Sequence, residues 1–216
     1  VHAIRNPIGA PTLTELVAQK GRETVILVDD QTRATPQKRV LPLLLNELNR
    51  AGVADEEITI LIALGTHRHM TEGECLLRFG AEVMERVEVV NHAFDDPRKL
   101  VNLGETASGL PISVSRRYYE SDISIAVGNI IPHIYAGWAG GGKMVQPGVC
   151  GPETTAATHL AAATMFPQIV ATLDNPIRKE INEVALRSGL TMIVNTVLNS
   201  QRRIVKVVVG HLVEAF

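Results

Sequence analysis

The chain has 216 residues, of which 45% are hydrophobic and 20% charged, and its formal net charge is -2. This composition is that of a globular protein with one sizeable core. Its scattered lysines and arginines argue against nucleic acid or an anionic membrane as the main partner, and no apolar run has the length of a membrane span or signal. Two cysteines cannot form a disulfide framework, so we expect a cytoplasmic protein.

Apolar runs typical of strands alternate along the chain with runs typical of helices. The strand-like runs cover residues 24–28, 58–64, 87–90, 123–127, 190–194 and 204–209, and the helix-like runs cover 12–19, 37–51, 72–79, 153–165 and 176–188. Thr71 and Glu74 have the spacing of a helix start, and Gly52 and Gly80 stand where helices end. The alternation predicts an α/β fold, a Rossmann-like and mostly parallel sheet with helices on both faces.

Polar side chains follow four of the predicted strands. They are Asp30, Thr32 and Arg33, then His67, then His92, then His133 and Lys143. Ligands of open α/β sheets bind outside the carboxyl ends of the strands. The sequence therefore predicts a site at this edge of the sheet.

Each of these groups also has a structural interpretation. Asp30 could cap the next helix, or it could hold a hydroxyl while Arg33 binds a carboxylate or phosphate. His67 could bond a backbone carbonyl or serve as an acid–base group. We expect His69 and His92 to be structural or supporting residues.

A glycine-rich segment carries the lysine. Five glycines lie between positions 137 and 148, and Gly137 to Lys143 has the G-x-x-x-x-G-K pattern of a phosphate-binding loop. Met144 stands where such loops have the serine or threonine that binds magnesium, so a nucleoside triphosphatase is excluded. The loop could still receive a phosphate, and Lys143 could supply charge or covalent chemistry.

His159 lies in a predicted helix of small residues. It could be a core histidine or a ligand of a transition metal. One histidine cannot hold a metal alone, so an organic cofactor would have to supply other ligands.

Several motifs resemble those of the nickel-pincer-nucleotide-dependent lactate racemase family, over nearly the whole chain. They are Asp30-Gln31-Thr32-Arg33-x-Thr35-Pro36, Leu64-Gly65-Thr66-His67-Arg68, Ile131-Pro132-His133-x-Tyr135-Ala136-Gly137-Trp138-x-Gly140-Gly141-x-Lys143 and Asn175-Pro176-x-Arg178-x-Glu180. The spacings from His133 to Lys143 and from Lys143 to His159 are similar as well.

The resemblance implies racemisation or epimerisation of a 2-hydroxy acid by reversible hydride transfer to a nickel-bearing cofactor, pyridinium-3-thioamide-5-thiocarboxylic acid mononucleotide. Lys143 would attach this cofactor covalently, and His159 would bind the nickel. His67 and His133 would be the alternating base and acid. The other cofactor-binding residues would be Asp30, Thr32, Arg33, Gly140 and Gly141.

The resemblance also implies parts that lie outside this sequence. Residues 1–216 would form one cofactor-binding catalytic domain of a longer protein, loaded by cofactor-biosynthesis proteins and lacking its second, C-terminal domain. Lactate-specific members have aromatic residues after the loop histidine, whereas this chain has Ile134 there. The particular 2-hydroxy acid, the activity of this fragment alone and the oligomeric state are left open.

Two other functions are compatible with the residues. A cofactor- or nucleotide-binding module without catalysis would keep its function after replacement of His67 or His133. A zinc hydrolase would gather His67, His69, His92 and His159 around the metal, although no carboxylate or cysteine joins these histidines at a familiar spacing.

Overall fold

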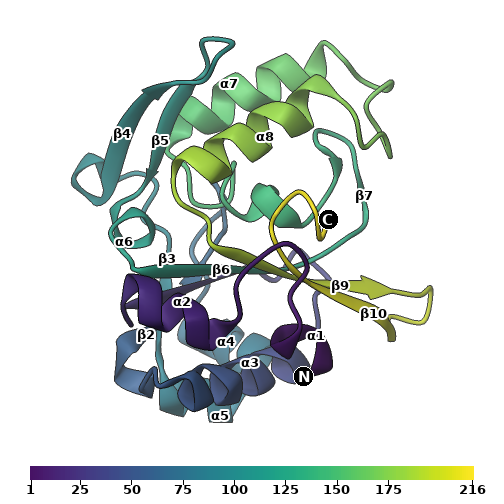
Figure 1. Cartoon of the computed structure of the whole chain (residues 1–216). Coiled ribbons are helices and arrows are strands. Elements are labelled where there is room, and N and C mark those ends of the chain that lie inside the picture. Colours follow the sequence, from purple (N-terminus) through teal and green to yellow (C-terminus); the bar gives the residue numbers. More distant parts are fainter.

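The computed structural model describes all residues from Val1 to Phe216. Its centre is a six-stranded sheet in the order β10-β9-β6-β1-β2-β3 (Figure 1). The strands are β1 (Thr24–Val28), β2 (Ile58–Ile62), β3 (Glu88–Asn91), β6 (Ile123–Asn129), β9 (Met192–Leu198) and β10 (Ile204–Gly210). All neighbours are parallel except β9 and β10, so the predicted mostly parallel sheet is confirmed.

Helices cover both faces of the sheet, as the alternation of apolar runs predicts (Figure 1). One face packs against α1 (His2–Arg5), α2 (Leu13–Lys20), α3 (Gln37–Ala51), α4 (Glu72–Phe79) and α5 (Ala81–Arg86), and the other lies beneath α6 (Arg116–Tyr119), α7 (Pro152–Ala163) and α8 (Pro176–Arg187). No helix is both long and apolar enough to span a bilayer.

Strand β1 shows why its apolar run is continuous. Ile26 and Val28 join the core on the α3 face, whereas Val25 and Leu27 join the core on the opposite face. A strand buried on both faces needs apolar residues at every position, and each fully buried Ile, Leu or Val side chain stabilises the fold by about 1.5–3 kcal/mol.

Two small hairpins lie outside the predicted elements. The strands β4 (Leu100–Glu105) and β5 (Pro111–Ser115) form an antiparallel pair beside the main sheet, and β7 (Pro132–His133) pairs with β8 (Gly137–Trp138). Most of β4 is half-buried or exposed, so it lacks the apolar run that marks the central strands. Short 3-10 turns complete the structure: η1 (Asp55–Glu57), η2 (Pro97–Lys99) and η3 (Gly141–Met144).

The predicted boundaries differ from the observed ones at several ends. The second strand ends at Ile62 rather than at Leu64, because the chain turns there toward the loop of His67. The fifth begins at Met192 and continues to Leu198, because it pairs with β10 along that length. The helix predicted over 153–165 is α7, which ends at Ala163.

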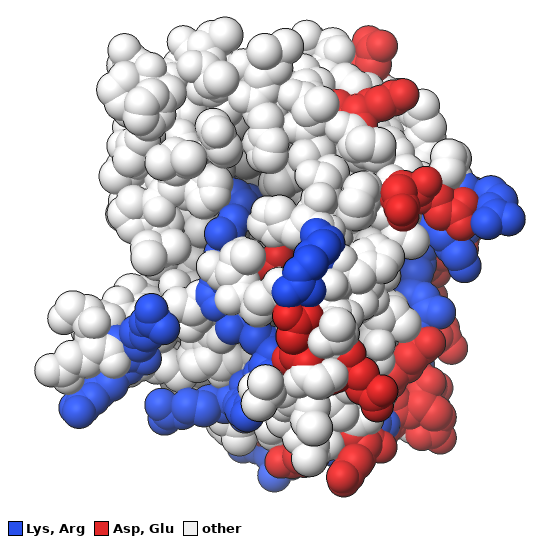
Figure 2. Space-filling view, turned by 180° about the vertical axis from the view of Figure 1, so that it is seen from behind, with Lys and Arg blue, Asp and Glu red and all other residues white.

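Charged side chains are unevenly distributed over the surface. In the space-filling view from behind, the upper part carries few of them, whereas lysines, arginines, aspartates and glutamates gather on the lower part (Figure 2). Leu160, Phe166 and Leu173 are exposed large apolar side chains of the α7–α8 region.

His92 links the end of β3 to the loop before α7. It is 1% exposed, and its Nε2 lies 2.9 Å from the Cys150 carbonyl oxygen. Burial lowers the pKa of His92, the Cys150 carbonyl opposes this effect, and the nearby His69 adds to it. The buried ring is therefore neutral at pH 7 and donates its Nε2–H to the carbonyl.

This histidine makes stability depend on acidity. Below about pH 6.5 the unfolded chain protonates the histidine while the folded chain does not. The free energy of unfolding therefore decreases as the pH is lowered, by at most ~1.4 kcal/mol per pH unit for one proton. Urea unfolding at pH 7 and pH 5 measures this. We expect a smaller difference between the two pH values in His92→Gln than in the parent, whereas an unchanged difference would contradict the assignment.

Candidate active site

A cavity of about 510 Å³ lies at the carboxyl ends of β1, β2 and β6, where the strand-end residues predict a site. Eight of the nine predicted site residues line it: Asp30, Thr32, Arg33, His67, His133, Gly140, Lys143 and His159. The ninth, Gly141, lies behind the wall, where its backbone N–H donates to Asn195 Oδ1 at 3.3 Å. Three loops and α7 thus bring distant parts of the sequence to one place.

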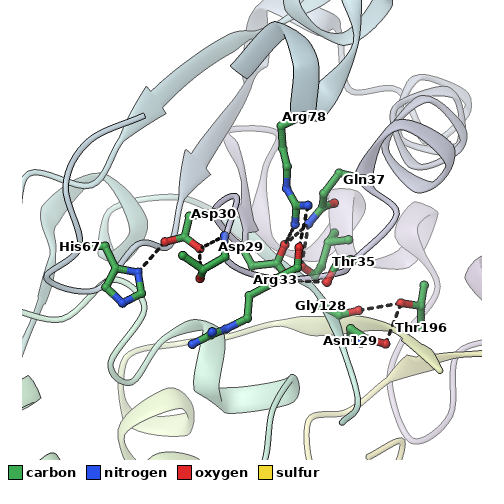
Figure 3. Close-up of polar contacts among 12 residues, drawn as sticks. Asp29, Asp30, Arg33, Thr35, Gln37, His67, Arg78, Gly128, Asn129 and Thr196 are labelled. Atoms are coloured by element: carbon green, nitrogen blue, oxygen red, sulfur yellow. Dashed lines mark hydrogen bonds and ion pairs between the residues drawn. The ribbon is translucent and has the colours of Figure 1, made fainter. Parts of the chain in front are cut away.

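Asp30 and His67 form a hydrogen-bonded pair on one side of the cavity (Figure 3). Asp30 Oδ2 lies 2.6 Å from His67 Nδ1, and Asp30 Oδ1 accepts the Thr32 N–H at 2.9 Å. Burial alone would raise the pKa of Asp30, but hydrogen bonds from Thr32 and His67 outweigh burial and lower it. The ionised carboxylate holds the proton of the imidazole on Nδ1 and leaves Nε2 for proton transfer.

Asp29, directly before this pair, has a structural role. It accepts hydrogen bonds from Thr35, from Gln37 at 3.1 Å and from Arg78, which also donates to the Arg33 carbonyl at 2.8 Å (Figure 3). These contacts fix the loop after β1.

The interpretation of Asp30 as a helix cap is wrong. The N-cap of α3 is Pro36, and no side chain caps that helix. The Arg33 guanidinium bonds to no group of the protein and faces the cavity, where it can bind an anionic group.

His133 is held by the small β7–β8 hairpin. Its Nδ1 accepts the Tyr135 backbone N–H at 3.1 Å, so Nδ1 is unprotonated and Nε2 carries the proton of the neutral ring. Burial, followed by the charges of Lys143 and Arg33, lowers the pKa of His133 to about 3. His133 is therefore neutral at pH 7, with a fixed tautomer.

Lys143 projects from η3 into the cavity wall. Protein surrounds it while part of its surface stays open to the cavity. Burial, and then the charges of Arg33 and Arg178, lower the pKa of Lys143 to about 7. In a large fraction of the molecules the Lys143 side chain is thus an uncharged amine at neutral pH, which is the nucleophilic form of lysine.

His159 reaches the cavity from α7, beside Tyr135, whose ring centroid is 5.0 Å away. Burial, and then the charges of Lys143 and His67, lower the pKa of His159. It presents a neutral imidazole, the form that binds transition metals. No group of three or more His, Cys, Asp or Glu side chains lies close enough to hold a metal. The zinc alternative, which needs four histidines together, is therefore wrong.

Residues that the sequence analysis did not assign to the site support its walls. Asn129, at the end of β6, lines the cavity, and Thr196 Oγ1 lies 3.4 Å from its Oδ1 (Figure 3). Arg178 and Asn195 hold the glycine loop from behind. Arg178 belongs to the motif Asn175-Pro176-x-Arg178-x-Glu180, but nothing in the sequence indicates which residues its side chain contacts.

Comparisons with known proteins show the family of this chain. The family model described as the lactate racemase N-terminal domain matches residues 1–172. The lactate racemase of Thermoanaerobacterium thermosaccharolyticum is 32% identical over 211 residues, which are 97% of this chain and 49% of that protein. The lactate racemase of Lactiplantibacillus plantarum is 32% identical over 205 residues, 94% of this chain and 48% of that protein.

Solved structures show the same fold. The lactate racemase apoprotein of T. thermosaccharolyticum superposes with a TM-score of 0.92 at 32% identity, over 99% of this chain and 51% of that one. A Thermotoga maritima protein superposes with a TM-score of 0.77 at 28% identity, over 91% of this chain and 52% of that one. This chain spans about half the length of the relatives it matches. It belongs to the lactate racemase family and corresponds to the N-terminal domain.

Proposed function

We propose that this chain is the cofactor-binding catalytic domain of an enzyme that racemises or epimerises a 2-hydroxy acid. The observation that carries the proposal is the shared cavity. It contains two differently held imidazoles, His67 and His133, together with a buried amine, Lys143. Proton transfer in two directions and covalent attachment of a cofactor need these groups.

The cavity fits the nickel-pincer nucleotide by the chemistry of its side chains. Lys143 has no carboxylate partner and would form the covalent link, whereas His159 offers a neutral nitrogen to nickel. Arg33 and Gly140 would receive the anionic groups, and Asp30 and Thr32 would border the cofactor. When bound, the cofactor supplies a reversible hydride acceptor, a chemistry that no protein side chain provides.

The two histidines would handle the hydroxyl proton of the substrate. His67 Nε2 would accept it for one enantiomer, while Asp30 stabilises the imidazolium that forms. His133 would serve the other enantiomer through Nε2; to accept a proton there, the ring has to move its own proton to Nδ1 and give up the hydrogen bond from the Tyr135 N–H. Arg33 would hold the carboxylate of the acid or an anionic group of the cofactor.

Replacing Asp30 by asparagine tests the pairing with His67. The amide cannot fix the imidazole tautomer or stabilise its charged form, so we expect racemisation to fall about 10- to 100-fold while cofactor attachment persists. The measurement is kcat in both directions together with intact mass. Parent-like kcat would contradict the role of Asp30.

The proposed activity is tested with the full-length protein carrying its cofactor and single enantiomers of lactate, malate, phenyllactate and sugar acids. Chiral chromatography should show the opposite configuration at C2 for at least one of them. In deuterated water, hydride transfer retains the original hydrogen at C2, whereas proton abstraction introduces deuterium. No turnover of any 2-hydroxy acid, or deuterium at C2 of the product, would contradict the proposal.

A further inference from the structure

Arg178 is a buried cation without an acidic partner. Arg178 is 3% exposed, and its Nε has no hydrogen-bond partner. Burial lowers the pKa of Arg178 to about 10, and no carboxylate opposes this shift. The aromatic ring of Phe216 lies 4.6 Å from the guanidinium carbon. Burying an arginine without a carboxylate costs stability, so this charge needs an explanation in what it contacts.

The contacts of Arg178 lead directly to Lys143. Its Nη2 donates to the Trp138 carbonyl, and its Nη1 donates to the Gly140 carbonyl at 3.4 Å. The same Gly140 oxygen accepts the backbone N–H of Lys143 at 3.3 Å. One carbonyl therefore joins the guanidinium to the turn η3 that carries Lys143.

The glycine loop needs contacts that hold it in the conformation that presents Lys143. Gly140 and Gly141 have φ values of 80° and 59°, and a Cβ added to Gly141 would lie 2.7 Å from the Phe216 ring. Asn195 receives the Gly141 N–H from the opposite side. Arg178 from α8 and Asn195 from β9 thus hold three residues of the segment 138–141, namely Trp138, Gly140 and Gly141.

We propose that Arg178 is a positioning residue for Lys143: it fixes the loop that presents the amine, and it places an uncompensated positive charge behind that amine. The role rests on the proposed function of Lys143 as cofactor anchor. The charge of Arg178 acts with that of Arg33 to lower the pKa of Lys143.

Other titratable groups surround the amine. The carboxylates Asp29 and Asp30 act in the opposite direction on Lys143, but Asp29 is bound to Arg78 and Asp30 to His67. The imidazoles of His133 and His159 complete the surroundings, and the charge of Lys143 lowers the pKa of both. Burial and the two arginines therefore prevail, and the amine stays partly uncharged at neutral pH.

The test uses this 216-residue chain and two readouts that need no cofactor. Trace acetic anhydride acetylates free amines, with release of acetate and a proton, and peptide mass spectrometry reports labelling of Lys143 as a function of pH. Hydrogen exchange reports the backbone amides of residues 138–144. Arg178→Met removes charge and donors, and Arg178→Lys keeps the charge but loses the two-pronged hydrogen bonding.

A matched control lies on the same helix. Arg187 also donates to two backbone carbonyls, those of Glu105 and Leu103, but on the β4–β5 hairpin. Arg187→Met should leave both readouts at Lys143 unchanged, whereas a change as large as that of Arg178→Met would overturn the proposal.

In the parent, the rate of labelling at Lys143 should reach half of its high-pH value near pH 7. We expect Arg178→Met to raise this midpoint by about one pH unit, which lowers labelling at pH 7 about fivefold. Arg178→Lys should keep the midpoint and speed exchange of residues 138–144 about tenfold or more.

A parent-like midpoint in a folded Arg178→Met chain, or parent-like exchange in Arg178→Lys, overturns the proposal. If circular dichroism shows that the methionine variant does not fold, exchange in the lysine variant decides. Failure of the proposed function would instead appear as an unmodified Lys143 in the cofactor-loaded protein, so the two failures are distinguishable.

Discussion

Replacing Lys143 by methionine should abolish covalent cofactor attachment and reduce racemisation by the full-length protein to background. The side chain is the one amine of the cavity wall, and the lowering of its pKa to about 7 gives it nucleophilic character at neutral pH. Methionine has a similar length but cannot form an amide or imine. Arginine keeps the positive charge but remains protonated, so Lys143→Arg should also lose the attachment.

The readouts are intact mass, nickel content and turnover of the preferred 2-hydroxy acid. Lys179→Met is the matched control, because Lys179 is an exposed residue of α8 whose amine pairs with Asp174 at 2.8 Å. It should behave as the parent does. Substantial racemisation by Lys143→Met would mean that the lysine is not essential to the cofactor site.

Replacing either His67 or His133 by asparagine should lower kcat by about 10²- to 10⁴-fold, the usual contribution of a general acid or base. Asparagine keeps a polar side chain in the cavity but cannot transfer a proton near neutral pH. Attachment at Lys143 should persist, since neither histidine bonds to that lysine. Loss of activity with retention of cofactor is the pattern that distinguishes catalysis from binding.

His69→Asn is the control for the His67 variant. His69 is exposed two residues away, and its ring packs edge-on against Phe94 rather than lining the cavity. We expect parent-like turnover from it. If His67→Asn and His133→Asn also turn over substrate as the parent does, the chain is a cofactor-binding module and the proposed acid–base roles are wrong.

The central fold could be predicted because its signals are local. Continuous apolar runs mark strands buried on both faces, and the capping box at Thr71 marks a helix start. The antiparallel direction of β10 could not be predicted, because an apolar run has the same appearance whichever way the strand runs. The β4–β5 hairpin also escaped prediction, since its exposed residues leave no continuous apolar run.

The site could be predicted as a set of residues but not as a set of interactions. Strand ends place Asp30 and His67 at one edge of the sheet, yet only the fold shows that they share a hydrogen bond. The contrast between Asp29, bound to Arg78, and the adjacent Asp30 depends on which way each side chain points. Arg178 is 35 residues from Lys143 in the sequence, so its grip on the Gly140 carbonyl follows from tertiary packing alone.

The central claim is that Lys143 anchors a nickel-bearing nucleotide. The direct measurement combines intact mass, peptide mapping and metal analysis of the full-length protein, produced in a host that makes the pincer cofactor. The account predicts a mass increase confined to the peptide with Lys143, accompanied by nickel. An unmodified Lys143 and no nickel in protein that racemises a 2-hydroxy acid would contradict it.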